Sequence, residues 1–186
     1  MASLKALAIC GSLRKDSFNL KLLNIAKTVA QNAGLTVVAA DLKELNLPLY
    51  NYDIEAAGFP EPVRKLSDMV KEADMLLIAS PEYNYSFSGV LKNAIDWVSR
   101  VKPNPFNGKA AGIFGASTGA YGTVRGQNHL RQALTCVNVF VPAQPQVLVA
   151  MADTAFEVDG SLKNKDVEEK LKELILKTAA YIRRAP

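Results

Sequence analysis

The sequence predicts an α/β fold in which five parallel strands form one sheet and helices cover both of its faces. Three observations support this prediction. Five short apolar segments alternate with helical patterns along the 186 residues. These segments lack the polar alternation of a half-exposed strand, which is typical of strands buried on both sides. Three of them end in loops of unusual composition, rich in glycine, serine and aromatic residues. We expect residues 1–186 to form a single domain.

The elements follow one another in a regular order. The first strand segment runs from Leu4 to Cys10, and the helical pattern from Phe18 to Ala33 ends before Gly34. Further strands are expected at 35–40, 75–79, 110–115 and within 139–149. Further helices are expected from Pro62 to 73, after the N-cap Ser88, at about 123–136 and at 166–183. Residues 41–59 are expected to be irregular, and an additional hairpin would fit within 142–162.

Crossover connections between parallel strands are right-handed, which leaves few topologies for this order of elements. Among them we favour the flavodoxin-like strand order 2-1-3-4-5, a three-layer sandwich with helices on both sides of the sheet.

Composition excludes several classes of protein. The two cysteines, Cys10 and Cys136, form no CxxC, and His129 is the single histidine, so we expect neither a disulfide scaffold nor a metal site. The net charge of +4 comes from scattered lysines and arginines, which does not indicate nucleic-acid binding. No apolar run approaches the ~20 residues of a membrane span. Met1 leads into a strand without a signal-peptide pattern. We therefore expect a cytoplasmic protein without membrane or nucleic-acid partners.

In an open parallel sheet, ligands bind beyond the carboxyl ends of the strands, near the point where the strand order reverses. In the order 2-1-3-4-5, the loops after the first, third and fourth strands meet there. These are the three loops of unusual composition, at 11–19, 80–88 and 117–122. The sequence therefore predicts the ligand site at these loops.

The loop after the first strand suits a phosphate group. It leads to a helix N-terminus, where free N–H groups and the helix dipole attract anions. Ser12, Ser17 and Asn19 add hydrogen-bond donors, and Arg14 adds a planar guanidinium. Neither GxxxxGK[ST] nor GxGxxG is present. A loop of hydroxyl groups favours a terminal phosphomonoester, hence a mononucleotide. The alternative is that Ser17 only caps the helix and Arg14 is solvated.

The other two loops suit a flat heterocycle. The segment Pro81–Tyr85 can lay its main-chain groups along a ring, although a tight turn with exposed tyrosines is the alternative. Residues 115–119 match GxSxG, the nucleophile elbow of α/β-hydrolases. However, no acidic residue lies between Ser117 and His129, and there is no second histidine. A ligand-holding loop is therefore favoured over a hydrolase. We expect Cys10 to be an inert buried thiol, His129 an ordinary helix residue and Trp97 a packing residue.

These loops resemble those of the NAD(P)H-dependent FMN reductase family, especially its quinone and chromate reductase branch. The matching stretches are Gly-Ser-Leu-Arg-Lys-Asp-Ser-Phe-Asn at 11–19, Pro-Glu-Tyr-Asn-Tyr-Ser at 81–86, Leu-Lys-Asn-Ala-Ile-Asp-Trp at 91–97, Ser-Thr-Gly at 117–119 and His-Leu-Arg-Gln at 129–132. The likeness covers nearly the whole chain and is weakest after Pro145.

The resemblance implies a flavodoxin-like domain that holds one non-covalent FMN and assembles as a homodimer or homotetramer. By this likeness, Ser12, Arg14, Ser17 and Asn19, with Phe18 beside them, hold the phosphate. The isoalloxazine lies along Pro81, Glu82, Tyr83, Asn84 and Tyr85, and Ser117, Thr118 and Gly119 approach it from the other side.

Members of the family take hydride from NADH or NADPH and pass electrons to quinones, flavins, azo compounds or metal oxyanions such as chromate. Because hydride moves between the nicotinamide and the flavin, no catalytic side chain is expected, and the cycle is expected to be ping-pong. The main alternative is a flavodoxin-type electron carrier that does not itself oxidise NAD(P)H. Typical flavodoxins are acidic and lack an arginine in the phosphate loop, whereas this chain is basic and has Arg14.

Overall fold

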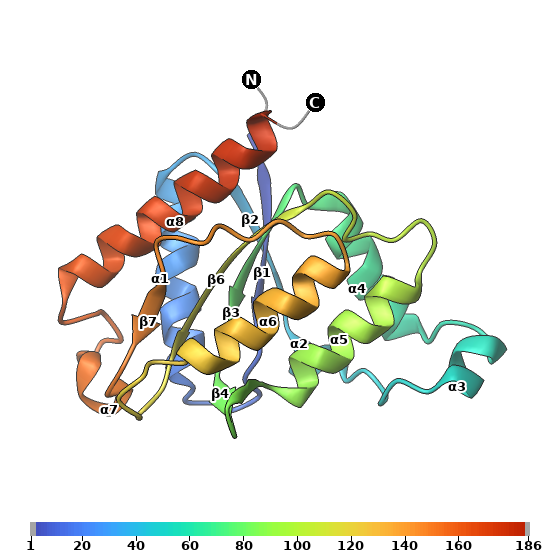
Figure 1. Cartoon of the computed structure of the whole chain (residues 1–186), viewed down its shortest axis with the longest axis horizontal. Helices are drawn as coiled ribbons and strands as arrows, with labels where there is room; N and C mark the ends of the chain where they lie inside the picture. Colours follow the sequence, from blue (N-terminus) through green and yellow to red (C-terminus); the bar gives the residue numbers. More distant parts are fainter. Residues whose placement is uncertain (1–2, 185–186) are drawn as a thin grey trace.

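Five parallel strands form the central sheet of the computed structural model, which describes residues 3–184 (Figure 1). The strands are β1 (Lys5–Cys10), β2 (Thr36–Ala40), β3 (Met75–Ala79), β6 (Ala110–Ala116) and β7 (Val147–Val149). Their spatial order is β2-β1-β3-β6-β7, which confirms the predicted order 2-1-3-4-5. Because β2 and β3 lie on opposite sides of β1, the strand order reverses between β1 and β3.

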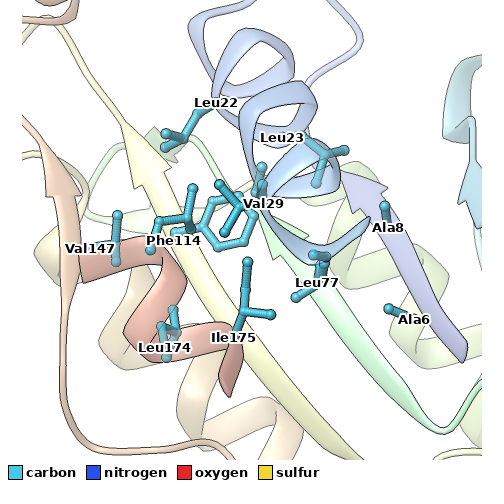
Figure 2. Close-up of a cluster of buried hydrophobic side chains, with 14 of the residues drawn as sticks. Ala6, Ala8, Leu22, Leu23, Val29, Leu77, Phe114, Val147, Leu174 and Ile175 are labelled. Atoms are coloured by element: carbon cyan, nitrogen blue, oxygen red, sulfur yellow. The ribbon is translucent and has the colours of Figure 1, made fainter. Parts of the chain in front are cut away.

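One face of the sheet is covered by α1 (Phe18–Asn32) and α8 (Lys165–Arg184). Phe114 of β6 lies at the centre of this layer, between Leu22 of α1 and Ile175 of α8 (Figure 2). All three side chains are fully buried. Burying side chains of this size contributes about 1.5–3 kcal/mol each. This layer therefore holds α1, and with it the loop after β1, against the sheet.

The opposite face is covered by four helices. They are α2 (Leu42–Leu45), α4 (Glu61–Glu72), α5 (Gly89–Arg100) and α6 (Val124–Cys136). Trp97 of α5 is fully buried, and its indole N–H donates to the carbonyl oxygen of Pro48 at 2.7 Å. This confirms the prediction that Trp97 is a packing residue. Among residues 3–184, no helix combines the length and the apolar character that crossing a membrane needs.

The predicted helix boundaries agree with the structure to within one or two residues. The hydroxyl of Ser88 accepts from the N–H of Leu91, as expected of an N-cap of α5. Pro62 lies in the first turn of α4, where its missing N–H leaves no helical hydrogen bond unmade. Gly34 follows α1 with φ of +84°, a conformation that a Cβ disfavours.

Three regions differ from the prediction. Residues 41–59 are not wholly irregular, since Asp41 and Asn51 cap the short helices α2 and α3 (Tyr52–Ala57). One or two turns are too short to produce a helical periodicity in the sequence. The fifth strand is reduced to β7, and Phe140 forms only an isolated bridge with Ala110. Pro142 and Pro145, which lie between Phe140 and β7, have no N–H to donate to a neighbouring strand. The strand therefore does not continue through this segment.

A hairpin that the sequence did not predict lies in the loop after β3. It comprises β4 (Glu82–Tyr83) and β5 (Ser86–Phe87), which pair antiparallel within the loop after β3. Within 142–162, where a hairpin was expected to fit, the chain forms α7 (Ala152–Ala155) and then a short reversal. Phe156 and Leu162 form an antiparallel bridge, and the N–H of Glu157 donates to the carbonyl of Ser161 at 2.8 Å.

Candidate functional site

The three loops that the sequence singles out lie side by side at the carboxyl ends of β1, β3 and β6. The N–H of Gly11 donates to Ala79 at the end of β3, at 2.8 Å. In turn, the N–H of Ser80 donates to Phe114 near the end of β6, at 2.9 Å. The loops after β1 and β3 are therefore each fixed to the neighbouring strand at their first residue.

The loop after β1 presents unused donors. The main-chain N–H groups of Phe18 and Asn19, the first two of α1, find no acceptor within residues 3–184. Ser12 is half-buried, whereas Arg14 is exposed, and within the same residues its guanidinium pairs with no carboxylate. Free N–H groups at the start of a 15-residue helix are groups to which an anion can bind, and the exposed Arg14 belongs to the same loop.

Two residues predicted for this loop have additional structural roles. Ser17 is buried, and its hydroxyl oxygen accepts from the N–H of Leu20 at 3.4 Å, so it does cap α1. The amide of Asn19 is buried too, and it donates to the carbonyl of Ala116 and accepts from its N–H, both at 2.9 Å. The Asn19 amide keeps one hydrogen that these bonds do not use.

Cys10 lies beneath the same loop. Burial raises the pKa of its thiol, an effect that hydrogen bonds from the Ser12 main chain and the Ser17 side chain partly oppose. The raised pKa keeps the sulfur protonated near neutral pH, as expected of an unreactive thiol.

The loop after β3 turns sharply outward. Pro81 is buried, Tyr83 and Tyr85 are exposed, and the β4–β5 hairpin turns at Asn84 and Tyr85. Both turn residues have positive φ, 48° and 69°, as in a type I′ turn. Asparagine is common at the first of these positions, but a bulky tyrosine at the second is unusual.

Glu82 turns toward α6. Its Oε2 accepts from the N–H of Gly126 at 2.9 Å, and its Oε1 lies 3.8 Å from Nη1 of Arg125. The Arg125 guanidinium carbon lies 4.3 Å from the ring centroid of Tyr85 and 4.3 Å from that of Tyr121. Sequence reasoning did not identify Arg125, Gly126 or Tyr121. A glycine within the first turn of a helix is a sign of close backbone approach that could have directed attention there.

The loop after β6 is held from both sides. The N–H of Ser117 donates to the carbonyl of Val149, and the Ser117 hydroxyl accepts from the N–H of Gly119 at 3.1 Å. Thr118 and Gly119 are exposed. The ring of His129 is 3.2 Å from the hydroxyl of Ser86, not near Ser117. A nucleophile elbow needs a histidine base beside its serine, so this geometry does not support the hydrolase interpretation.

Two cavities adjoin these loops. One of about 400 Å³ lies between the loops after β1 and β3 and is lined in part by Gly11, Arg14, Tyr83 and Ser88. A second, of about 310 Å³, lies between α1 and the end of β2. Arg14 borders both cavities.

Comparison with known proteins gives the family. The model of the NADPH-dependent FMN reductase family matches residues 4–154, a range that contains all three loops. An NAD(P)H-dependent FMN reductase of Pseudomonas aeruginosa is 42% identical over 181 residues, covering 97% of this chain and 96% of that protein. A 2-hydroxy-1,4-benzoquinone reductase of Burkholderia sp is 35% identical over 183 residues, 97% of each protein.

Solved structures agree. The flavoenzyme NAD(P)H:(acceptor) oxidoreductase FerB of Paracoccus denitrificans superposes with a TM-score of 0.86 at 31% identity, covering 97% of this chain and 98% of that one. With the sheet order and the three loops already described, these matches show that the chain belongs to the NADPH-dependent FMN reductase family.

Proposed function

We propose that this protein holds one FMN non-covalently in its three loops and passes hydride from NADPH or NADH to small-molecule acceptors in a ping-pong cycle. Quinones and flavins are the first acceptors to test, and azo compounds and chromate follow. The observation that carries the proposal is the meeting of the three loops at the point where the strand order reverses, beside an anion site with unused donors.

The anion site fits the phosphate of the flavin. The N–H groups of Phe18 and Asn19, at the start of α1, have no acceptor among residues 3–184 and can donate to phosphate oxygens. The hydroxyls of Ser12 and Ser17 and the guanidinium of Arg14 lie in the same loop. A dianionic group there interacts favourably with the helix dipole and with the fork of the arginine.

The ring is assigned to the space between the other two loops. Pro81, Glu82, Tyr83, Asn84 and Tyr85 would border one side of it, and Ser117, Thr118 and Gly119 the other. The adjoining cavity between the loops after β1 and β3 supports this assignment, since both Arg14 of the first loop and Tyr83 of the second line it. Main-chain groups of these loops can meet charge that develops on the ring.

The chain need not supply acid or base chemistry. FMN, when bound, accepts and returns the two electrons of the hydride. The protein's part is to bind the phosphate, fix the plane of the ring and leave one face open to two substrates in turn. We accordingly propose no catalytic side chain and no metal.

We also propose a cytoplasmic homodimer or homotetramer without nucleic-acid or membrane partners. Exposed rings around the site, those of Tyr83, Tyr85 and Tyr121, support an assembly in which a second copy covers this edge. Light scattering over a hundredfold dilution tests it, and a monomer mass at every concentration would contradict it.

The decisive experiment is an absorption spectrum of the purified protein with FMN, taken before and after anaerobic addition of NADPH. Flavin bands that bleach on NADPH, and return when a quinone is added, support the reductase. Bands that NADPH leaves unchanged indicate the electron carrier instead. Failure to bind FMN would contradict the central assignment.

A further inference from the structure

The hairpin in the loop after β3 is fastened to α6 at several points. The carboxylate of Glu82 accepts from the N–H of Gly126 at 2.9 Å and faces Arg125. Ser86 contacts the ring of His129, and a Cβ on Gly126 would come within 3.2 Å of the Ser86 carbonyl group. The hairpin therefore lies directly on the first turns of α6, and its position depends on that helix.

Arg125 is the side chain that joins this hairpin to the loop after β6. Its guanidinium carbon is 4.3 Å from the ring centroids of both Tyr85 and Tyr121. Tyr85 belongs to the loop after β3, and Tyr121 to the loop after β6. A guanidinium attracts the faces of both rings, and Glu82 limits its movement along the edge.

One end of this contact has an unfavourable backbone conformation. Tyr85, at the turn of the hairpin, has φ of 69°. Such conformations persist in residues other than glycine only where the surroundings hold them. The stacking of Arg125 on Tyr85 is a contact that holds this turn.

We propose that Arg125 is a positioning residue that sets the separation of the two loops between which the flavin ring is assigned. This inference rests on the proposed function. Arg125 does not itself contact the reacting atoms in this role, because its guanidinium is engaged by two tyrosine rings and by the carboxylate of Glu82. It acts through Tyr85 and Tyr121.

The test measures FMN dissociation constants of the apoprotein by fluorescence titration. Arg125→Met keeps the length of the side chain and removes its charge and planar group. We expect the dissociation constant to rise about tenfold, as loss of two cation–π contacts implies. Arg125→Lys restores the charge without the planar stacking, and we expect it to recover about half of that loss on a logarithmic scale.

Arg100→Met is the matched control. Arg100 also combines a cation–π contact, to Tyr50, with an ion pair, to Glu55 at 2.9 Å, but it lies at the last turn of α5, away from the loops. We expect its dissociation constant to stay within about twofold of the wild type, as for surface substitutions elsewhere.

Visible circular dichroism at saturating FMN separates positioning from general stability. The dichroism signal reports the asymmetry of the protein around the flavin ring. We expect this signal to change in Arg125→Met and not in Arg100→Met. Tyr121→Leu should raise the FMN dissociation constant about as much as Arg125→Met does. The double variant should raise it little more than either single variant, because each of the three variants breaks the same contact between Arg125 and Tyr121. Independent, multiplying effects would overturn the inference.

An unchanged dissociation constant and dichroism in Arg125→Met would also overturn it, while leaving the flavin assignment intact. If the Met variant does not fold, wild-type values in both Arg125→Lys and Tyr121→Leu would overturn it equally. Wild-type protein that binds no FMN would contradict the proposed function itself, and the inference with it.

Discussion

The side chain of Asn19 pairs with both main-chain groups of Ala116, 97 residues further along the chain, through two hydrogen bonds of 2.9 Å. The amide thus behaves like one residue of a neighbouring strand. It joins the first turn of α1 to the end of β6, and so holds the loop after β1 beside the loop after β6.

We expect Asn19→Ala to lower the free energy of unfolding by about 2–4 kcal/mol. The buried N–H and carbonyl of Ala116 would both lose their hydrogen bond to the Asn19 side chain. Urea denaturation of the apoprotein measures this. Asn24→Ala is the matched control, since Asn24 lies on the same helix and is exposed. It should leave stability within about 0.5 kcal/mol. Equal losses in the two variants would contradict the structural role of Asn19.

Arg14 is expected to affect the ligand and not the fold. Arg14→Ala should weaken FMN binding by about 1.5–3 kcal/mol, the usual contribution of a hydrogen bond to a charged group. The unfolding free energy should hardly change, since the side chain is exposed. Fluorescence titration measures the affinity, and Arg183→Ala, at the end of α8, serves as the control. Wild-type affinity in Arg14→Ala would remove Arg14 from the phosphate site.

Phe114 tests the layer beneath α1 and α8. Phe114→Ala should cost about 3–5 kcal/mol of stability, because the ring is fully buried and its neighbours can fill only part of the space. Chemical denaturation checks this against Val158→Ala, whose side chain is fully exposed. A loss below 1 kcal/mol for Phe114→Ala would mean that the layer repacks more readily than its burial suggests.

The ion pair between Glu55 of α3 and Arg100 of α5 should weaken at low pH. Hydrogen bonds from Tyr50 and Arg100 lower the pKa of Glu55 below its ordinary 4.5. The unfolded chain then binds a proton at Glu55 more readily than the folded chain does. The stability that this contact contributes is therefore fully present above about pH 5 and is lost as pH falls through the pKa of Glu55 in the folded protein. We expect melting temperatures between pH 6 and pH 3 to fall less steeply for Glu55→Gln than for the wild type. Identical slopes would show that the contact contributes nothing.

Much of the fold follows from local patterns. The buried strands β1, β3 and β6 are recognised as short, uninterrupted apolar runs, and the long helices α1, α4, α5 and α8 repeat a helical period over enough residues to be recognised. The handedness of crossovers then leaves few strand orders, and the one favoured among them, 2-1-3-4-5, is the order that the structure has. The short helices α2 and α3 could not be predicted by periodicity, although Asp41 and Asn51 supply the cap that starts each of them.

The sequence by itself also determined that these three loops meet, since the carboxyl ends of adjacent parallel strands lie at the same edge of the sheet. Only the tertiary structure decided what those loop residues contact. Asn19 reaches Ala116, Glu82 turns to the N–H of Gly126, and Arg125 lies between Tyr85 and Tyr121. A residue type and its spacing indicate which bonds a side chain can make, but its partner depends on which distant backbone the packed layers bring within hydrogen-bond distance.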